Sequence, residues 1–262
     1  MKVAVLGCGP AGLMAAHAAA SLGVPTVVMS RKRKSPLYGA QYLHAPIPNV
    51  TDRDARVTVD YRLVGSVDDY RRKVYGRWWD GTVSPEDLEE EHEAWDIRST
   101  YDRLWDMYQD AIVDVDVDGP SVKKVQEHFD LVVNTIPLNS LCMNPSHVFK
   151  SQEIMAAGDA PDLGIQLNRM YTCPPNMVVC NGEDSPLWYR MSNIFGHMTV
   201  EWPGGSNPPV STAAVVRKPI SNNCDCLPGV LLAGRYGSWT KGVLSHDSYR
   251  VVGAYVERKF WR

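Results

Sequence analysis

The stretch Val3-Ala4-Val5-Leu6-Gly7-Cys8-Gly9-Pro10-Ala11-Gly12 decides the fold of this chain. Its first four residues form a short apolar run, typical of a strand in the middle of a parallel sheet. The three glycines follow with G-x-G-x-x-G spacing, and the Ala-rich segment 13–22 predicts a helix. In this pattern the glycines permit a tight turn, close approach of the backbone to a pyrophosphate, and close packing of helix on strand. With a second strand predicted over 25–30, the pattern indicates a dinucleotide site. The alternative is a glycine turn of purely structural use.

The segment after the second predicted strand is basic. Ser30 stands where such domains usually carry an acid that holds a ribose hydroxyl. Arg31, Lys32, Arg33 and Lys34 follow directly. Three interpretations stay open: the cations bind the 2′-phosphate of NADP, they contact the phosphates of FAD from outside, or they form a solvated loop.

Composition describes an ordinary soluble protein. The chain has 262 residues, a formal net charge of −3 and 44% hydrophobic residues, so it offers no general surface for polyanions and has room for one large or two modest domains. Met1 leads directly into the first strand, and no apolar run approaches the ~18 residues of a membrane span. We therefore expect a cytoplasmic protein without a signal peptide or membrane partner.

The potential metal ligands do not form a familiar motif. Six cysteines stand at positions 8, 142, 173, 180, 224 and 226, without C-x-x-C spacing, so we expect reduced thiols. Cys224 and Cys226 are too close together for an ordinary structural zinc site. Asp114, Asp116 and Asp118 are not followed by the terminal glutamate of a calcium loop, because Val125 stands at its position. The sequence therefore predicts no metal site.

Residues 51–110 are expected to form a helical cap, preceded by a loop over 35–50 with three prolines. The loop carries Gln41 and His44, which either line a site or belong to a segment that simply packs on the sheet. A half-exposed strand is predicted over 56–64, a short helix capped by Ser66 follows, and a longer helix is predicted from Ser84 to Asp110. Between these helices lies a basic and aromatic cluster: Arg71, Arg72, Lys73, Arg77, Trp78 and Trp79. Such a cluster can stack nucleic-acid bases, cover a flavin, or form a solvated helix face.

The second half of the chain again contains apolar strands that end in polar or glycine turns. The apolar strand over 129–134 ends in a polar turn with Thr135, which we expect beside the first glycine turn. Residues 146–224 contain several strand-like runs and predict a sheet-rich insertion on the substrate side. Segment 229–237 is another strand with a glycine turn, and a helix is predicted over 240–262. Residues 1–50, 111–145 and 225–262 then form the nucleotide-binding domain, in which two helix N-termini converge on one ligand.

The order of these segments resembles a known superfamily. The glycine motif, the strand ending in Asn134-Thr135-Ile136-Pro137, and the terminal Leu232-Ala233-Gly234-Arg235-Tyr236-Gly237-Ser238-Trp239 resemble FAD-dependent proteins of the glutathione-reductase-like superfamily. Within it, Tyr189-Arg190-Met191-Ser192 followed by Thr199-Val200-Glu201-Trp202-Pro203 is similar to a strand pair of UDP-galactopyranose mutases and their amine-oxidase relatives. The chain is shorter than those enzymes, and it is also similar to compact phage flavoproteins that release amines from amino-acid-modified thymine in DNA.

The resemblance implies an α/β fold: a Rossmann-like FAD-binding domain with a parallel central sheet, a small sheet-rich insertion and a helical cap. It also implies that Arg190 faces the flavin pocket and that the turn at Arg235 supports the flavin. The expected FAD-binding residues are Gly7, Gly9, Pro10, Ala11, Gly12, Ser30, Arg31, Lys32, Gln41, Thr135, Gly234, Arg235, Trp239 and Gly242.

Three functions remain open at this stage. Arg190 is a candidate anchor for an anionic substrate unless it pairs with Glu201, and His44 and His246 are candidate bases because imidazole titrates near neutral pH. The first function is an FAD-dependent oxidoreductase acting on a small amine or a sugar nucleotide. The second is an FAD-dependent, amine-cleaving enzyme acting on a modified base in DNA. The third is a non-catalytic nucleotide-binding protein. The oligomeric state stays open.

Overall fold

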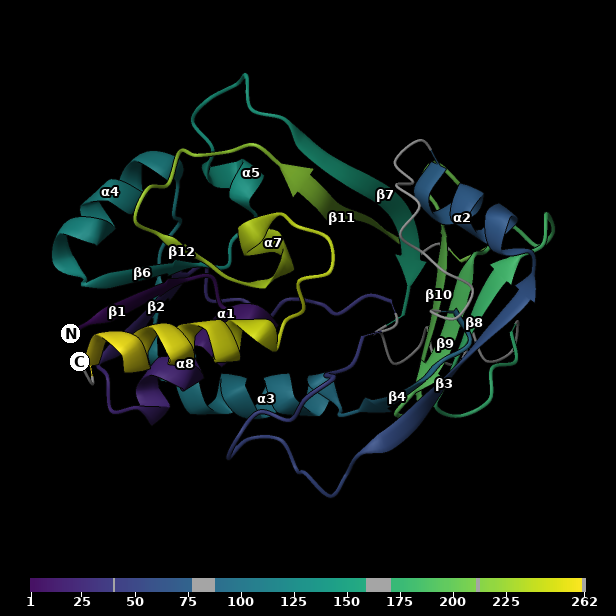
Figure 1. Cartoon of the computed structure of the whole chain (residues 1–262), viewed down its shortest axis with the longest axis horizontal. Helices are drawn as coiled ribbons and strands as arrows, with labels where there is room; N and C mark the ends of the chain where they lie inside the picture. Colours follow the sequence, from purple (N-terminus) through teal and green to yellow (C-terminus); the bar gives the residue numbers. More distant parts are fainter. Residues whose placement is uncertain (40, 77–87, 159–170, 211–212, 261–262) are drawn as a thin grey trace.

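The computed structural model describes residues 1–39, 41–76, 88–158, 171–210 and 213–260. These residues build two sheets that stand beside each other, with strands β7 and β11 running from one body into the other (Figure 1). Both chain ends lie at the far side of the first sheet (Figure 1). Among the described helices, none combines the length and apolarity needed to cross a membrane.

The first sheet is parallel and confirms the predicted α/β, Rossmann-like architecture. Its spatial order is β12 (Leu231–Leu232), β6 (Leu131–Asn134), β1 (Val3–Leu6), β2 (Thr26–Ser30) and β5 (Ile112–Asp114). One face is covered by α1 (Pro10–Ser21), α3 (Ile97–Tyr108) and α8 (Asp247–Phe260), and the other by α4 (Gly119–His128) and α5 (Leu138–Leu141) (Figure 1). All residues of β1 and β6 are buried, as expected for central strands.

The strand order places a ligand site at the carboxyl ends of β1 and β6. From β1 the chain moves first to β2 on one side and later to β6 on the other, so the order reverses between these two strands. Ligands of open α/β sheets bind outside the carboxyl ends at this switch point. The Thr135 hydroxyl, just after β6, donates to the carbonyl of Leu6 at 2.7 Å, which confirms that this strand ends beside the first glycine turn.

The second sheet is mixed and larger. Its order is β11 (Ala214–Asn222), β7 (Phe149–Ala157), β10 (His197–Pro203), β9 (Arg190–Ile194), β8 (Met177–Gly182), β3 (Val57–Gly65) and β4 (Glu91–Ala94). Its described pairings are antiparallel except that of β3 with β8. Helix α2 (Val67–Tyr75) packs on this sheet with Tyr70 and Val74 buried, and its predicted cap is confirmed because the Ser66 hydroxyl accepts from the Asp69 amide.

The prediction of a helix from Ser84 to Asp110, with or without a break, is wrong at Glu91–Ala94 and is confirmed at Ile97–Tyr108. Residues Glu91–Ala94 form strand β4, because pairing with β3 outweighs the helix propensity of this acidic segment. Helix α3 begins only after Asp96, whose carboxylate accepts from the Arg98 amide. The segment expected as a helical cap therefore supplies two strands to the second sheet and one helix to the core of the first. The predicted helix start at Ser84 lies outside the described residues.

Candidate active site

The first glycine turn has room for a side chain at one of its three glycines. Gly7 has φ +103°, and an added Cβ would lie 2.6 Å from the Thr135 hydroxyl. At Gly12 an added Cβ would lie 2.0 Å from the Gly7 carbonyl oxygen, so helix and strand pack too closely for a side chain. At Gly9, which precedes α1, the nearest atom to an added Cβ is the Ser35 hydroxyl at 3.5 Å. A side chain would therefore fit at Gly9 in ordinary contact with Ser35, at the N-terminus of a 12-residue helix whose N-cap makes no side-chain hydrogen bond.

The second glycine turn lies against the first. Gly234 opens α7 (Gly234–Ser238) with φ +69°, and a Cβ there would lie 2.6 Å from the Cβ of Ala11. A Cβ on Gly237 would lie 2.2 Å from the Asn134 carbonyl oxygen. The Ser248 hydroxyl of α8 donates to the Ala11 carbonyl at 2.7 Å. These contacts bring the two glycine turns together at the switch point, with Ala11 between them.

Trp239 holds the second turn in place. Its side chain is buried, its indole nitrogen donates to the Lys150 carbonyl at 3.0 Å, and its ring meets Phe149 edge-on at 5.6 Å. Trp239 ends α7 with φ +50°. Gly242, with φ +84°, has no atom within 4 Å of an added Cβ and lies in open space. A cofactor role for either residue stays a prediction.

The basic segment after β2 lies among carboxylates. Ser30 is the register partner of Asp114 on the edge strand β5. Arg31 forms an ion pair with Asp116, and Lys32 lies 3.9 Å from Asp110. These pairs are exposed and contribute little stability. They nevertheless place negative charge where a 2′-phosphate would bind, which favours the solvated-loop interpretation over NADP recognition.

A buried carboxylate on the second sheet gathers two cations. Glu201 on β10 is 1% exposed and is the register partner of Arg190 on β9. The Arg190 guanidinium donates from Nη2 at 2.5 and 2.8 Å and from Nε at 3.1 Å, while Lys218 of β11 donates at 2.5 Å. The Tyr189 hydroxyl also donates to this carboxylate. Glu201 thus accepts from three side chains and cannot swing freely.

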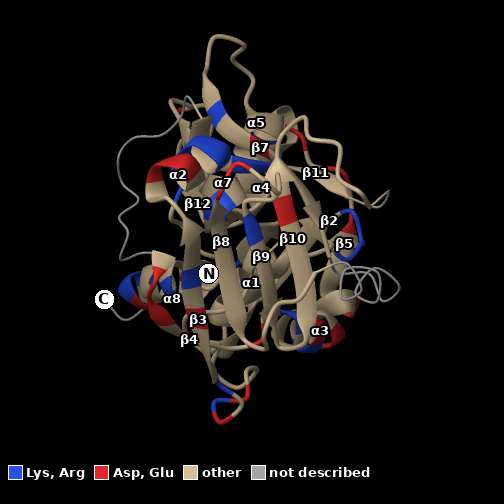
Figure 2. Cartoon of the chain, turned by 90° about the vertical axis from the view of Figure 1, so that its right-hand side faces the viewer, with Lys and Arg blue, Asp and Glu red and all other residues tan. Residues whose placement is uncertain are grey.

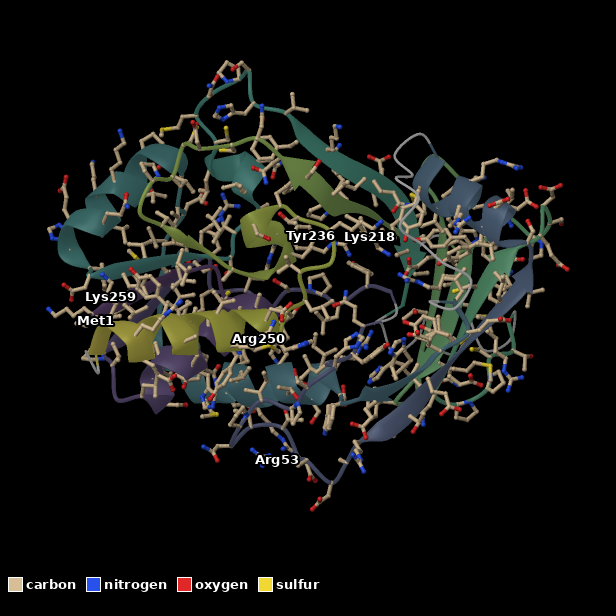
Figure 3. All side chains as sticks on the ribbon, viewed as in Figure 1. Met1, Arg53, Lys218, Tyr236, Arg250 and Lys259 are labelled. Carbon is tan, nitrogen blue, oxygen red and sulfur yellow. The ribbon has the colours of Figure 1, made fainter. Side chains whose placement is uncertain are left out.

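The charges of this cluster do not cancel. Burial, followed by repulsion from Arg190, lowers the pKa of Lys218 to about 7. Although burial alone would raise the pKa of Glu201, the Arg190 and Lys218 charges hold it well below its usual range. Arg235 of α7 approaches from the first sheet and donates to the Pro219 carbonyl at 3.1 Å, and its Nε is buried without a hydrogen-bond partner in the described part of the chain. We call Arg190, Lys218, Arg235 and Glu201 the arginine–lysine cluster; Figure 3 shows Lys218 and the neighbouring Tyr236 between the two sheets.

Of the two roles that the sequence left open for Arg190, the structure shows the ion pair with Glu201. The forked guanidinium of Arg190 is therefore largely committed within the protein. Lys218 belongs to no motif and was not predicted, and Tyr189 was quoted only as part of a resemblance, without a role of its own. The group with unused donor capacity is instead Arg235, whose Nε has no hydrogen-bond partner among the described residues. Because the cluster holds more cations than carboxylates, it is suited to binding an anion.

The two candidate bases meet although 202 positions separate them in the chain. The rings of His44 and His246 are 5.9 Å apart, and His92 of β4 lies 5.7 Å from His44. Partial burial, followed by repulsion from the other two imidazoles, lowers the pKa of His44 to about 4. Burial also lowers the pKa of His246, whose Nδ1 is buried without a partner among the described residues. The lowered pKa values leave His44 and His246 neutral at pH 7, each with an unprotonated ring nitrogen.

The loop over 35–44 covers the buried carboxylate. Gly39 has φ +83°, and a Cβ there would lie 2.4 Å from Oε1 of Glu201. The Gln41 amide donates to the Tyr38 carbonyl at 2.5 Å, which braces the loop from within. The ring of Tyr42 lies 4.5 Å from that of His44. The Tyr42 hydroxyl donates to the Tyr61 hydroxyl at 3.4 Å. The loop thus connects the histidines to the second sheet.

Two surface hollows differ in their relation to the glycine turns. One of about 390 Å³ has Ser35, Arg98, Tyr101 and His197 in its lining, and the Ser35 hydroxyl is also the atom nearest to an added Cβ on Gly9. The other, of about 310 Å³, is lined by Met1, Asp130, Tyr255 and Lys259 at the amino-terminal edge of the first sheet (Figure 3). Only the first of these two lies on the side where the glycine turns are.

Two cations of the basic and aromatic cluster, which can stack bases, cover a flavin or form a solvated helix face, pair with acids. Arg71 lies 2.9 Å from Asp68, and Arg72 lies 2.8 Å from Asp69, both within α2. Figure 2 shows blue and red side by side on this helix rather than a basic face. Residues 77–79 of the cluster lie outside the described residues. This segment offers little excess positive charge for a phosphate backbone.

Sequence analysis also missed a group of metal-ligand side chains. Cys142, His147, Cys224 and Cys226 come from two segments about 80 positions apart, and their ligand atoms lie within 4.8 Å of one another. The prediction of no metal site rested on spacing within each segment alone. No local motif reveals this cluster, because it forms only when the two segments pack.

Comparison with known proteins shows a shared fold. No protein-family model and no curated protein sequence matches the chain. Among solved structures, a reduced UDP-galactopyranose mutase aligns over 100% of this chain and 96% of its own, with 11% identity and a TM-score of 0.57. A tetrameric 2-methyl-3-hydroxypyridine-5-carboxylic acid oxygenase aligns over 98% and 87%, with 12% identity and a TM-score of 0.46. Of these two, only the mutase is similar enough to show a common fold.

Proposed function

We propose that the chain is an FAD-dependent oxidoreductase whose substrate is a small amine or a sugar nucleotide. The observation that carries the proposal is the room for a side chain at Gly9, where an added Cβ would make only an ordinary contact with Ser35, in a turn whose other glycines, Gly7 and Gly12, have no such room. In dinucleotide sites, the second glycine of this motif is the one at which backbone and pyrophosphate approach each other. The fold shared with a UDP-galactopyranose mutase supports a flavin as the dinucleotide.

The chain offers distinct groups for the two ends of FAD. The pyrophosphate would lie at Gly9 and the first amides of α1, whose helix dipole favours negative charge. The ring would lie toward the second glycine turn, within reach of Arg235. When bound, a flavin supplies an acceptor for hydride or, once reduced, a nucleophilic nitrogen.

The arginine–lysine cluster and the histidines suggest how substrate is held. The cation surplus around Glu201 supports an anionic group on the substrate, and of the two proposed classes a sugar nucleotide carries such groups. Arg190 positions Glu201, which in turn fixes Lys218. His44 and His246, neutral at pH 7, would accept a proton from a substrate hydroxyl or ammonium group.

The first experiment asks which cofactor co-purifies. We expect a yellow protein that releases FAD on denaturation, identified by mass. Gly9→Val should fold normally and lose FAD, because the side chain takes the space of the pyrophosphate, whereas Gly253→Val in α8, where no atom lies within 4 Å of an added Cβ, is the matched control. A folded Gly9→Val protein with a full complement of FAD would contradict the proposal.

Two further measurements separate the alternatives. A colourless protein that binds no flavin would support the non-catalytic function. Salt-sensitive binding to DNA would support action on a modified base. Replacing Arg31, Lys32, Arg33 and Lys34 by Ser should leave FAD retention unchanged, and we expect no measurable NADP binding in the unaltered protein.

A further inference from the structure

Four metal-ligand side chains meet where the chain passes between the two sheets. Cys142 directly follows α5 and His147 precedes β7, whereas Cys224 and Cys226 lie in the connection from β11 to β12. All four are half-buried, and their ligand atoms lie within 4.8 Å of one another. This cluster is separate from the glycine turns and from the arginine–lysine cluster.

The distances match those around a tetrahedral ion. Zn–S bonds of about 2.3 Å and Zn–N bonds of about 2.0 Å place two sulfurs roughly 3.8 Å apart, and a sulfur and a nitrogen about 3.5 Å apart. The Sγ atoms of Cys142 and Cys226 are 3.6 Å apart. The Nδ1 atom of His147 lies 3.3 Å from the first sulfur and 3.5 Å from the second. Three edges of the expected tetrahedron are thus already formed.

The histidine is also oriented as a ligand. With Nδ1 toward the sulfurs, its Nε2 lies 3.4 Å from a carboxylate oxygen of Asp225 and 3.1 Å from the Asn144 amide nitrogen. Metal-binding histidines usually donate their second ring nitrogen to a carboxylate or carbonyl, which fixes the tautomer. Binding at Nδ1 leaves the proton on Nε2, where Asp225 can accept it.

The two segments are already docked without the ion. The Val148 amide donates to the Asn223 side chain at 2.6 Å, and the Cys224 amide donates to the Asn222 side chain at 2.8 Å. Asn222 also donates to the Ser238 carbonyl at 2.9 Å, at the end of α7. An ion held here would therefore fix the connection that supports the second glycine turn.

We propose that Cys142, His147, Cys224 and Cys226 bind one structural Zn²⁺ ion. Three thiolates and one imidazole are a ligand set that zinc prefers, and four protein ligands close the coordination sphere to substrate. The ion links the connection between α5 and β7 to the connection between β11 and β12. Its role is to hold β7 and β11 together where they run between the two sheets, and this role does not depend on a bound flavin.

The test measures metal in the purified full chain, produced without a histidine tag. We expect one zinc per chain by elemental analysis. Cys142→Ser and Cys226→Ser should each lose it, whereas Cys173→Ser, a buried cysteine outside the cluster, should keep it. In reduced protein stripped of zinc, added Co²⁺ should give the visible absorption of tetrahedral cobalt bound to thiolates, and Zn²⁺ should displace it.

A second variant keeps the test decisive if the cysteine variants fail to fold. Asp225 has a side chain that is 92% exposed, so Asp225→Ala should fold normally. It should weaken zinc binding about 10-fold, the lower end of the 10–100-fold range for such supporting carboxylates. Absence of stoichiometric zinc together with no cobalt–thiolate spectrum would overturn the proposal. So would a Cys142–Cys226 disulfide in metal-free protein, or zinc retained by both cysteine variants.

Discussion

At the scale of single residues, the buried carboxylate of Glu201 holds the cations Arg190 and Lys218 in place on the second sheet. A carboxylate that is 1% exposed stays ionised only because Arg190 and Lys218 donate to it. We predict that Arg190→Ala lowers the free energy of unfolding by about 3 kcal/mol, the lower end for breaking a buried ion pair, because Lys218 remains. Urea denaturation followed by fluorescence measures this change.

The same strands offer a matched control for that prediction. Arg217 is the neighbour of Lys218 and forms an exposed pair with Glu153 across β7 and β11, with the two side chains 67% and 46% exposed. Arg217→Ala should change stability by less than about 1 kcal/mol. Equal stability of both variants would show that the Glu201 pair contributes no more than a surface contact.

At the scale of elements, three segments bring His44, His92 and His246 together. The pKa of His44 is lowered to about 4 in the folded protein, against about 6.5 when unfolded. Between these values the unfolded chain binds more protons, so stability is complete above pH 6.5 and is lost as the pH falls toward 4. His44→Gln should flatten this part of the stability curve, measured as thermal midpoint against pH, whereas His128→Gln on the exposed end of α4 should not. An unchanged curve for His44→Gln would contradict the shift.

The elements also show how far sequence reasoning reaches. The strand and helix around Gly7 and Gly12 follow from local pattern, since spacing, apolarity and helix start agree within twelve residues. Strand β4 does not, because its acidic sequence becomes a strand only through pairing with β3. The pairing of Arg190 with Glu201 was visible as an alternative, since the two lie on one hairpin. The contact of Lys218 with Glu201 and the group of Cys142, His147, Cys224 and Cys226 could not be predicted, because both depend on packing between segments that are distant in the sequence.

At the scale of the whole molecule, the arginine–lysine cluster joins the two sheets. Glu201, Arg190 and Lys218 come from the second sheet, whereas Arg235 comes from the second glycine turn, which packs on the first. Arg235 differs from the other cations of the cluster because its Nε is buried without a hydrogen-bond partner among the described residues. A bound anion could accept a hydrogen bond from this Nε, and a reduced, negatively charged flavin is one such anion.

We therefore predict that Arg235→Gln keeps the fold and makes the midpoint potential of the bound flavin more negative. Loss of one charge-stabilising donor costs roughly 10²–10³-fold, which corresponds to about 60–90 mV for a two-electron couple. Thermal melting should be nearly unchanged, because a buried cation without a full set of partners contributes little to stability. Arg217→Gln, on the exposed face of β11, is the control for a general loss of positive charge. A potential that is the same in Arg235→Gln and in the unaltered protein would place the flavin ring away from the arginine–lysine cluster, since a cation in contact with the ring cannot be removed without destabilising its reduced, anionic form.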